Sequence, residues 1–349
     1  MVSTRRATVA GAGAGAAITV LVAVAGLTWA KWLPYVGKAL NAAHTGQWSG
    51  SDILHTGGVA AGDGPSWHAA TTFFTAYVGA IWPALVVALV LSACVQAFLP
   101  RSWLPGLFNR RRAVSSAAAG AAAGMPSMMC ACCSAPVAVT LRRNGVDQAA
   151  AVAYWLGNPL LNPAVLVFLA LVAPWQWTVT RLIVGAGAVI GAAVLVARFT
   201  RPVAQPDMTV PQQVTESRPA ASRFLAALAR LCVVLVPEYL VMVLAIGALR
   251  GWLLTIVDPA HRSLLVIVAV AIVGTLIVIP TAGEIPILQG LALLGVSAGV
   301  LGALLITLPA VSLPGIAMVI HTFGRRATAV ISAVVVGAGL VAALTLSVL

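Results

Sequence analysis

Charged residues are scarce in this chain, and their scarcity decides the class of protein. Only 8% of the 349 residues are charged and eight residues are acidic, whereas 61% are hydrophobic and the mean hydropathy is +1.02. A soluble globular protein needs more polar surface than this composition can supply. The sequence therefore excludes a soluble fold and predicts an all-α polytopic membrane protein.

The placement of arginine and cysteine excludes two further classes. The formal net charge is +12, but the arginines fall in short clusters between apolar runs. That pattern follows the positive-inside rule and is not typical of a nucleic-acid-binding surface. The five cysteines lie in apolar sequence, so they do not form an extracellular disulfide framework. No nucleotide-binding motif is present, so ATP would have to be hydrolysed by another chain.

Apolar runs and basic clusters divide the chain into five parts. We expect a first spanning helix over residues 7–30, followed by an exterior loop over residues 31–67. Pro, Gln and acidic residues indicate a cytoplasmic linker in the middle of the chain. The predicted parts are an N-terminal spanning helix with its exterior loop (1–70), a first permease repeat with an additional helix (71–199), the linker (200–222), a second repeat (223–326) and a C-terminal spanning helix (327–349).

A broken helix is expected in residues 113–141. This stretch is rich in small residues, contains Pro126 and Pro136, and is followed immediately by Arg142 and Arg143. A proline removes a backbone donor and clashes with the preceding turn, so the helix should break here. A single crossing would place the arginine pair outside, whereas a re-entrant hairpin returns it to the cytoplasm. We therefore predict a re-entrant hairpin.

The second half of the sequence repeats the first at an offset of 150 residues. Pro136 aligns with Pro286, and Pro159 aligns with Pro309. Prolines and glycines that coincide at a fixed offset indicate internal duplication. The arginine pair after the first hairpin corresponds to uncharged residues in the second repeat, as expected if that repeat is upside down. We predict about eight to ten membrane segments in two inverted repeats, each with a re-entrant hairpin whose tip lies near the midplane.

Three cysteines stand close together beside the predicted break. Cys130, Cys132 and Cys133, called the thiol cluster below, lie within four consecutive positions. Thiolates are the preferred ligands of soft metal ions and metalloids, and an unwound backbone would let two or three sulfurs approach one ion. Cysteine can also simply pack in a core. We interpret the thiol cluster as metal or substrate ligands, and Cys94 and Cys232, which stand alone, as packing residues.

Four polar residues near the prolines are further candidates for the substrate site. Glu284 is an acid at membrane depth, which predicts a cation or proton site unless it stabilises a helix start. Asn158, Asn162 and Ser312 flank the paired prolines after each hairpin. Their side chains could bind substrate or satisfy backbone groups freed by the breaks. Because inverted repeats bring their hairpin tips together, we expect Glu284 to approach the thiol cluster.

Two stretches resemble the signatures of a known family. They are CACCSAPVAV through LRRNGVDQAAAVAYWLGNPLLNP (residues 130–163) and EIPILQGLALLGVSAGVLGALLITLPAVSLP (residues 284–314). Both are similar to signatures of the predicted permease family that includes the organoarsenical efflux permeases. The resemblance extends from about Pro83 to Arg326, and it implies a transporter of the cytoplasmic membrane. Some members export trivalent methylated arsenicals through membrane cysteines, although members commonly read C-x-C-G where this chain reads CACCS.

These observations lead to one functional hypothesis and two alternatives. The hypothesis is a secondary permease of the cell membrane, not an enzyme and without a cofactor, that exports a soft metal(loid) or organoarsenical-type substrate. The thiol cluster would bind the substrate, and Glu284 would be its proton-linked partner. One alternative is a membrane thiol-redox protein in which Cys132 and Cys133, or Cys130 and Cys133, cycle between dithiol and disulfide. The other is a permease for an unrelated solute, with cysteines that only pack.

Overall fold

The structure is a computed structural model that describes residues 2–46, 54, 56–98, 103–199, 219–255, 264–293 and 295–349. These residues are helical almost throughout and contain no strand, which confirms the predicted all-α class. Most of the predicted linker, residues 200–218, lies outside the described residues. The helices of the first part of the chain are α1 (Val2–Leu27), α2 (Leu33–Thr45), α3 (Trp67–Phe98), α4 (Trp103–Phe108), α5 (Ala113–Gly124), α6 (Ala131–Arg143), α7 (Gln148–Leu160), α8 (Pro163–Val172) and α9 (Trp175–Phe199). Those of the second part are α11 (Ala220–Thr255), α12 (Leu264–Gly274), α13 (Glu284–Leu293), α14 (Ala298–Ala310), α15 (Leu313–Phe323) and α16 (Arg325–Val348).

Several helices are long and apolar enough to cross a membrane. Within the described residues there are five, namely Gly13–Thr45, Trp67–Phe98, Gln148–Val172, Trp175–Phe199 and Arg325–Val348. The pair α14 and α15, bent by 54°, makes a sixth if it is one broken span. Large apolar side chains such as those of Leu21, Val24, Ile183 and Leu344 are exposed on the outer helices, as expected for surfaces that face lipid. The protein is therefore a multi-pass membrane protein, and the larger count of eight to ten segments, which includes shorter helices, stays a prediction.

The N-terminal helix is longer than the sequence indicated. The expected loop over residues 31–67 is wrong at its start, because a π-helical turn (Thr28–Trp32) and α2 continue the helix to Thr45. Pro34 lies two residues after the π-helical turn, and it removes one backbone hydrogen bond from this continuous helix because proline has no N–H. Gly46 ends the helix with a left-handed backbone (φ 66°), which glycine adopts without strain.

The two halves of the molecule, α3–α9 and α11–α16, share an order of elements. Helices α7 and α14 begin 150 residues apart, and the side chains of Asp147 and Ser297 cap them by accepting a backbone N–H three residues on. A glycine with positive φ precedes each cap, Gly145 (87°) in the first half and Gly295 (80°) in the second. A broken pair, α7–α8 or α14–α15, and a long final helix, α9 or α16, then follow. This correspondence supports the predicted duplication, whereas the inverted orientation in a membrane stays a prediction.

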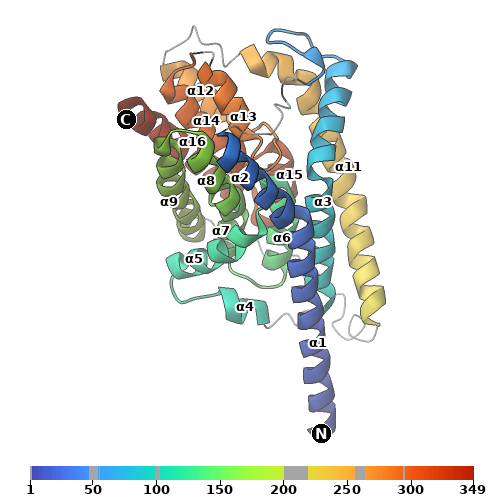
Figure 1. The fold of residues 1–349 in the computed structure, drawn as a ribbon. Coiled ribbons are helices and arrows are strands. Elements are labelled where there is room, and N and C mark those ends of the chain that lie inside the picture. The colour runs from blue at the N-terminus through green and yellow to red at the C-terminus, as the bar shows by residue number, and fades with distance from the viewer. Residues whose placement is uncertain are drawn as a thin grey trace.

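The core lies where the broken helices meet. All 13 residues of α7 are buried, and so is α6 from Ala131 to Leu141. Helix α3 packs along α11 and α9 packs against α16, so these equivalent elements of the two halves face each other. Helix α6 of the first half packs against α15 of the second. Figure 1 shows α4 and α5 toward the end of the molecule where the N-terminus lies, and α12 and α13 toward the other end. Gly120 on α5 and Gly302 on α14 leave no room for a Cβ atom against α7 and α16, which is the close packing expected of small residues in membrane helices.

Candidate substrate site at two helix breaks

The first break lies directly before the thiol cluster. Helix α5 ends at Gly124, and a 3-10 turn (Met125–Ser127) that contains Pro126 leads to Met128, whose φ is 50°. Cys130 is extended and precedes the first residue of α6. The second break, between α12 and α13, contains Ala282 with φ 66°. Met128 and Ala282 are the non-glycine residues with positive φ among those described, and such strained backbone clusters at ligand sites and switch regions.

The other predicted break positions have different roles. Pro136 lies inside α6, which continues to Arg143, so the prediction that this proline breaks the helix is wrong. Its missing N–H costs a single hydrogen bond, and its fixed φ fits a helix. Pro286 lies in the first turn of α13, where it is tolerated. Pro159 and Pro309 each stand one residue before the end of their helix, α7 and α14, and the chain breaks there.

The structure brings the three thiols together. Their Sγ atoms lie within 4.8 Å of one another, and all three residues are buried. The sulfurs of Cys130 and Cys132 are 2.9 Å apart, and the Tyr77 hydroxyl lies 3.1 Å from the Cys132 sulfur. Sulfurs bound tetrahedrally to one ion at about 2.3 Å would lie roughly 3.8 Å from each other. The observed separations, from 2.9 Å up to at most 4.8 Å, lie on both sides of that value.

Hydrogen bonds join α7 to the first break and to the start of α6. The Asn158 side-chain oxygen accepts from the Met129 N–H at 3.3 Å and from the Ser127 hydroxyl. The Trp155 ring N–H donates to the Ala131 carbonyl at 2.7 Å. The Ser134 hydroxyl donates to the Trp155 carbonyl at 3.3 Å. This carbonyl has no helical donor, because Pro159, four residues later, lacks an N–H. Of the two roles expected for Asn158, the geometry thus shows the one that stabilises the backbone.

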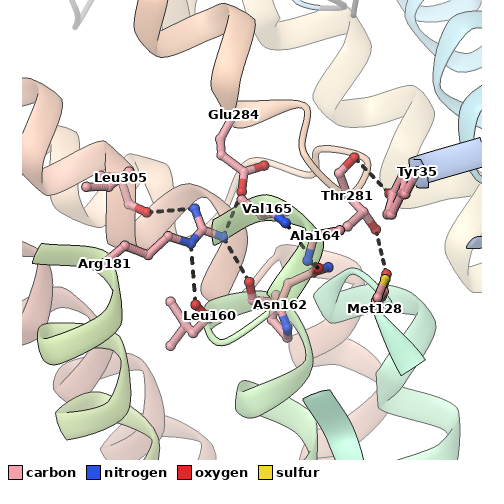
Figure 2. A network of polar contacts seen from close by, with 11 residues as sticks. Tyr35, Met128, Leu160, Asn162, Ala164, Val165, Arg181, Thr281, Glu284 and Leu305 are labelled. Atoms are coloured by element: carbon pink, nitrogen blue, oxygen red, sulfur yellow. Dashed lines mark hydrogen bonds and ion pairs between the residues drawn. The ribbon is translucent and has the colours of Figure 1, made fainter. Parts of the chain in front are cut away.

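Asn162 and Ser312 occupy equivalent positions but differ in their contacts. The Asn162 oxygen caps α8 by accepting from the N–H groups of Ala164 (3.0 Å) and Val165 (3.3 Å), and Figure 2 shows both bonds. Ser312 precedes α15 but makes no side-chain cap. Within the described residues, the Asn162 amide nitrogen and the Ser312 hydroxyl are buried without a hydrogen-bond partner. A buried polar atom without a partner is costly, so each of these two atoms can still form a hydrogen bond.

Glu284 is paired with an arginine that the sequence analysis did not consider. It is the first residue of α13, and its Oε1 lies 2.7 Å from Nη2 of Arg181 on α9. Both side chains are almost fully buried. Arg181 also donates to the carbonyl oxygens of Pro159 (2.8 Å), Leu160 (3.3 Å) and Leu305 (3.4 Å), and Figure 2 shows the guanidinium reaching Glu284, Leu160 and Leu305. Arg181 therefore joins both halves at the ends of their broken helices.

Prolines explain why Arg181 finds free carbonyls. In a helix the carbonyl of residue i accepts from the N–H of residue i+4. Pro163 and Pro309 lack that N–H, so the carbonyls of Pro159 and Leu305 have no helical donor. The guanidinium supplies donors to both, and it lies at the negative end of the α7 dipole. Arg181 thus takes the place of backbone donors that the prolines removed.

The two breaks touch through Thr281 and not through Glu284. The Thr281 hydroxyl donates to the Met128 carbonyl at 3.4 Å. It also accepts from the ammonium of Lys31 at 3.0 Å. The Tyr35 hydroxyl donates to the Thr281 carbonyl at 3.3 Å, and Figure 2 shows Thr281 between Tyr35 and Met128. The predicted meeting of hairpin tips therefore has a contact, made three residues before Glu284.

Four polar residues at these breaks escaped the sequence analysis: Lys31, Tyr77, Arg181 and Thr281. Two of them carried a readable signal. Lys31 follows the apolar run 7–30 directly, and Arg181 stands inside the apolar run 179–197. A charge within a membrane segment faces the protein interior and is a functional candidate by default. Nothing in the local sequence distinguishes Tyr77 or Thr281 from ordinary core residues.

A multi-pass helical bundle with thiols and an ion pair buried at two broken helices has the architecture of a membrane transporter. Residues 66–348 match the family ArsP_1, described as predicted permease. The chain belongs to this family, and it is a membrane permease. It is similar to the UPF0718 protein YraQ of Escherichia coli (strain K12), with 39% identity over 327 residues that cover 93% of this chain and 92% of that protein. No solved structure matched the chain.

Proposed function

We propose that this chain is a secondary permease of the cytoplasmic membrane that exports a soft metal or metalloid species bound by Cys130, Cys132 and Cys133. The observation that carries the proposal is the approach of three buried sulfurs to within 4.8 Å of one another. They lie in the core at the junction of a break and α6. Soft thiolate ligands select soft ions, and hard cations prefer oxygen.

The start of α6 places partial positive charge beside the sulfurs of these cysteines. Cys130 stands at the cap position, and Cys132 and Cys133 lie in the first turn. Backbone N–H groups at a helix start have no helical acceptor, and the helix dipole places positive charge there. Both effects stabilise thiolates, which are the form that binds metals. The helix start thus supplies part of the charge that the ligands need.

Transport would use the two halves as moving parts. We place the substrate between two inverted repeats, whose breaks meet through Thr281 and Met128 and whose ends are joined by Arg181 and Glu284. In transporters built from inverted repeats, one unit rocks against the other around a central site. The hydrogen bond from Thr281 to the Met128 carbonyl is a polar contact between the breaks, and such a bond can open and form again during the cycle.

Glu284 is the proton-linked residue in this scheme. A carboxylate that binds a proton loses its attraction for Arg181, so the pair would open when the acid is protonated. Arginine stays charged in proteins, and an unpaired buried cation would be costly. Here Arg181 keeps three carbonyl acceptors without Glu284. The pair can therefore break at a lower free-energy cost than an isolated one.

One observation favours the thiol-redox alternative. The sulfurs of Cys130 and Cys132 are 2.9 Å apart, and this pair differs from the two pairs expected from sequence. A redox protein would form a disulfide there and pass its electrons to a partner. Counting free thiols in the purified protein, before and after a reductant, separates the two functions: a permease keeps its thiols reduced through the transport cycle.

The test of the proposed function is transport by inside-out membrane vesicles. We expect accumulation of a soft ion or trivalent arsenical by vesicles that contain the wild-type chain. The variant with serine at Cys130, Cys132 and Cys133 should lose it, because serine keeps the size but not the soft sulfur. Cys94→Ser is the matched control, since Cys94 is a buried cysteine on α3, outside the cluster. Full transport by the triple variant would reduce the cluster to packing.

A further inference from the structure

Lys31 is a buried cation in a predominantly apolar membrane helix. Its exposed fraction is 4%, whereas Trp29 and Trp32 beside it are 51% and 42% exposed. The lysine lies in the π-helical turn Thr28–Trp32, and single π turns inside helices occur frequently at functional sites. An ionisable residue at membrane depth is costly and faces the protein interior. Lys31 lies outside the residues that match the permease family.

The Lys31 ammonium lies where the two breaks meet. Its Nζ donates to the hydroxyl oxygens of Thr281 at 3.0 Å and Tyr35 at 3.4 Å. Thr281 belongs to the second break, and it contacts Met128 of the first break, two residues before Cys130. The position joins the N-terminal helix to both halves of the molecule.

The hydrogen-bond partners of Lys31 carry no formal negative charge. Within the described residues no carboxylate forms an ion pair with it. The ionisable groups that interact with it electrostatically are Tyr35, Cys130, Cys133 and a second cation, Lys38. A buried ammonium is strongly unfavourable without a nearby opposite charge. Thiolates of the cluster are the groups that can supply that charge, because tyrosine gives up its proton only at high pH.

We propose that Lys31 is the counter-cation of the thiol site, and that the site therefore takes a soft divalent cation bound by all three thiolates. The proposal rests on the proposed function. A divalent ion with three thiolates carries one net negative charge, which one ammonium balances. A trivalent metalloid with three thiolates is neutral and leaves the ammonium unbalanced. An organoarsenical needs only two sulfurs, so its complex is neutral without Lys31. Binding forms metal–sulfur bonds, releases the protons of sulfurs that were thiols, and transfers no electron.

The experiment compares two probes on the purified full-length chain in lipid nanodiscs. The probes are Cd²⁺ and phenylarsine oxide, a trivalent organoarsenical, and their binding is measured by equilibrium dialysis with elemental analysis. Lys31→Gln removes the charge, Lys31→Arg keeps it, and Lys38→Gln is the matched control on the same helix. Lys31→Met is a second neutral variant. It replaces Lys31→Gln in the test if the glutamine variant does not purify as a monodisperse, folded protein.

We expect the neutral variants to weaken Cd²⁺ binding by at least about tenfold, because a buried unit charge beside an anionic complex contributes more than about 2.3 RT, the free energy of a tenfold change. Their affinity for phenylarsine oxide should change by less than about threefold on the same argument. Lys31→Arg should restore Cd²⁺ binding, and Lys38→Gln should leave both affinities near wild type. Unchanged Cd²⁺ affinity, or an equal loss for both probes, overturns the proposal. Undiminished binding of both probes by the triple serine variant would instead refute the proposed function.

Discussion

Arg181 and Glu284 form a buried ion pair of 2.7 Å that joins α9 of one half to α13 of the other. The two partners are not equally supported. Arg181 donates to three backbone carbonyls besides Glu284. The Glu284 carboxylate has Arg181 as its ion-pair partner within the described residues. The pair is therefore asymmetric, and so are the expected effects of removing either member.

Arg181→Met should destabilise the protein far more than Glu284→Gln. The methionine variant leaves a carboxylate unpaired and strips three carbonyls of their donor, and breaking a buried pair from one side costs about 3–5 kcal/mol. Glutamine at position 284 can still accept from Arg181, so its cost should be about 1–2 kcal/mol. Thermal unfolding in detergent measures both. Equal losses in the two variants would contradict this view of the pair.

The response to a proton gradient should depend on Glu284. Glutamine keeps the shape and hydrogen bonding of the side chain but cannot ionise. We expect Glu284→Gln to bind substrate, to lose most of its transport rate and to lose its response to an imposed pH gradient. Flux into vesicles, with wild type measured in parallel, checks this.

If Glu284 only stabilises the start of α13 through the helix dipole, the glutamine variant should be mildly destabilised and keep its pH profile. That outcome would end the idea of proton coupling through this residue. Asp147→Asn is a useful control, because it alters a helix-start carboxylate that caps α7 at a turn.

Single serine substitutions should separate the thiol cluster from the other cysteines. Cys132→Ser and Cys133→Ser should abolish transport at near-normal membrane abundance, because each removes a soft ligand. Cys94→Ser and Cys232→Ser should be nearly silent. Vesicle flux and immunodetection of the protein measure the two quantities. A transport defect at Cys94 as large as that at Cys132 would argue for a general packing effect.

Opposite-sided labelling would establish the inverted topology. Equivalent turns after α6 and α13 should lie on opposite sides of the membrane if the repeats are inverted. Single reporter cysteines are best placed at Arg143 and Leu293, which are exposed and 150 positions apart. In a chain without native cysteines, a membrane-impermeant maleimide should reach Leu293→Cys from outside and Arg143→Cys only after permeabilisation. Labelling of both from one side would rule out inversion.

The sequence was sufficient for features that depend on local chemistry. Scarce charge predicted the membrane bundle, and the spacing of Cys130, Cys132 and Cys133 predicted a cluster that the structure brings together. The broken helix before them also followed from Pro126. Residues whose meaning depends on distant partners were missed. Lys31 reads as the start of a polar loop until Thr281, 250 residues away, contacts it.

Predicting a helix break at each proline was too simple, because the effect of a proline depends on which backbone carbonyl loses its donor. Pro136 lies within α6, which remains continuous. Pro309 frees the Leu305 carbonyl, and a side chain from another helix serves it. No local pattern states which freed carbonyl will meet an arginine. Only the packing of α9 against α14 and α7 reveals it.

The acceptors shared around Arg181 also constrain how the protein can move. The carbonyls of Pro159 and Leu305 belong to different halves and depend on one guanidinium for a donor. If the halves separate, at least one of these carbonyls loses that donor, and proline offers no N–H to replace it. Water is the remaining small donor that can follow the motion. Opening of this permease should therefore admit water to the interior, where it hydrates the freed carbonyls as the helices move.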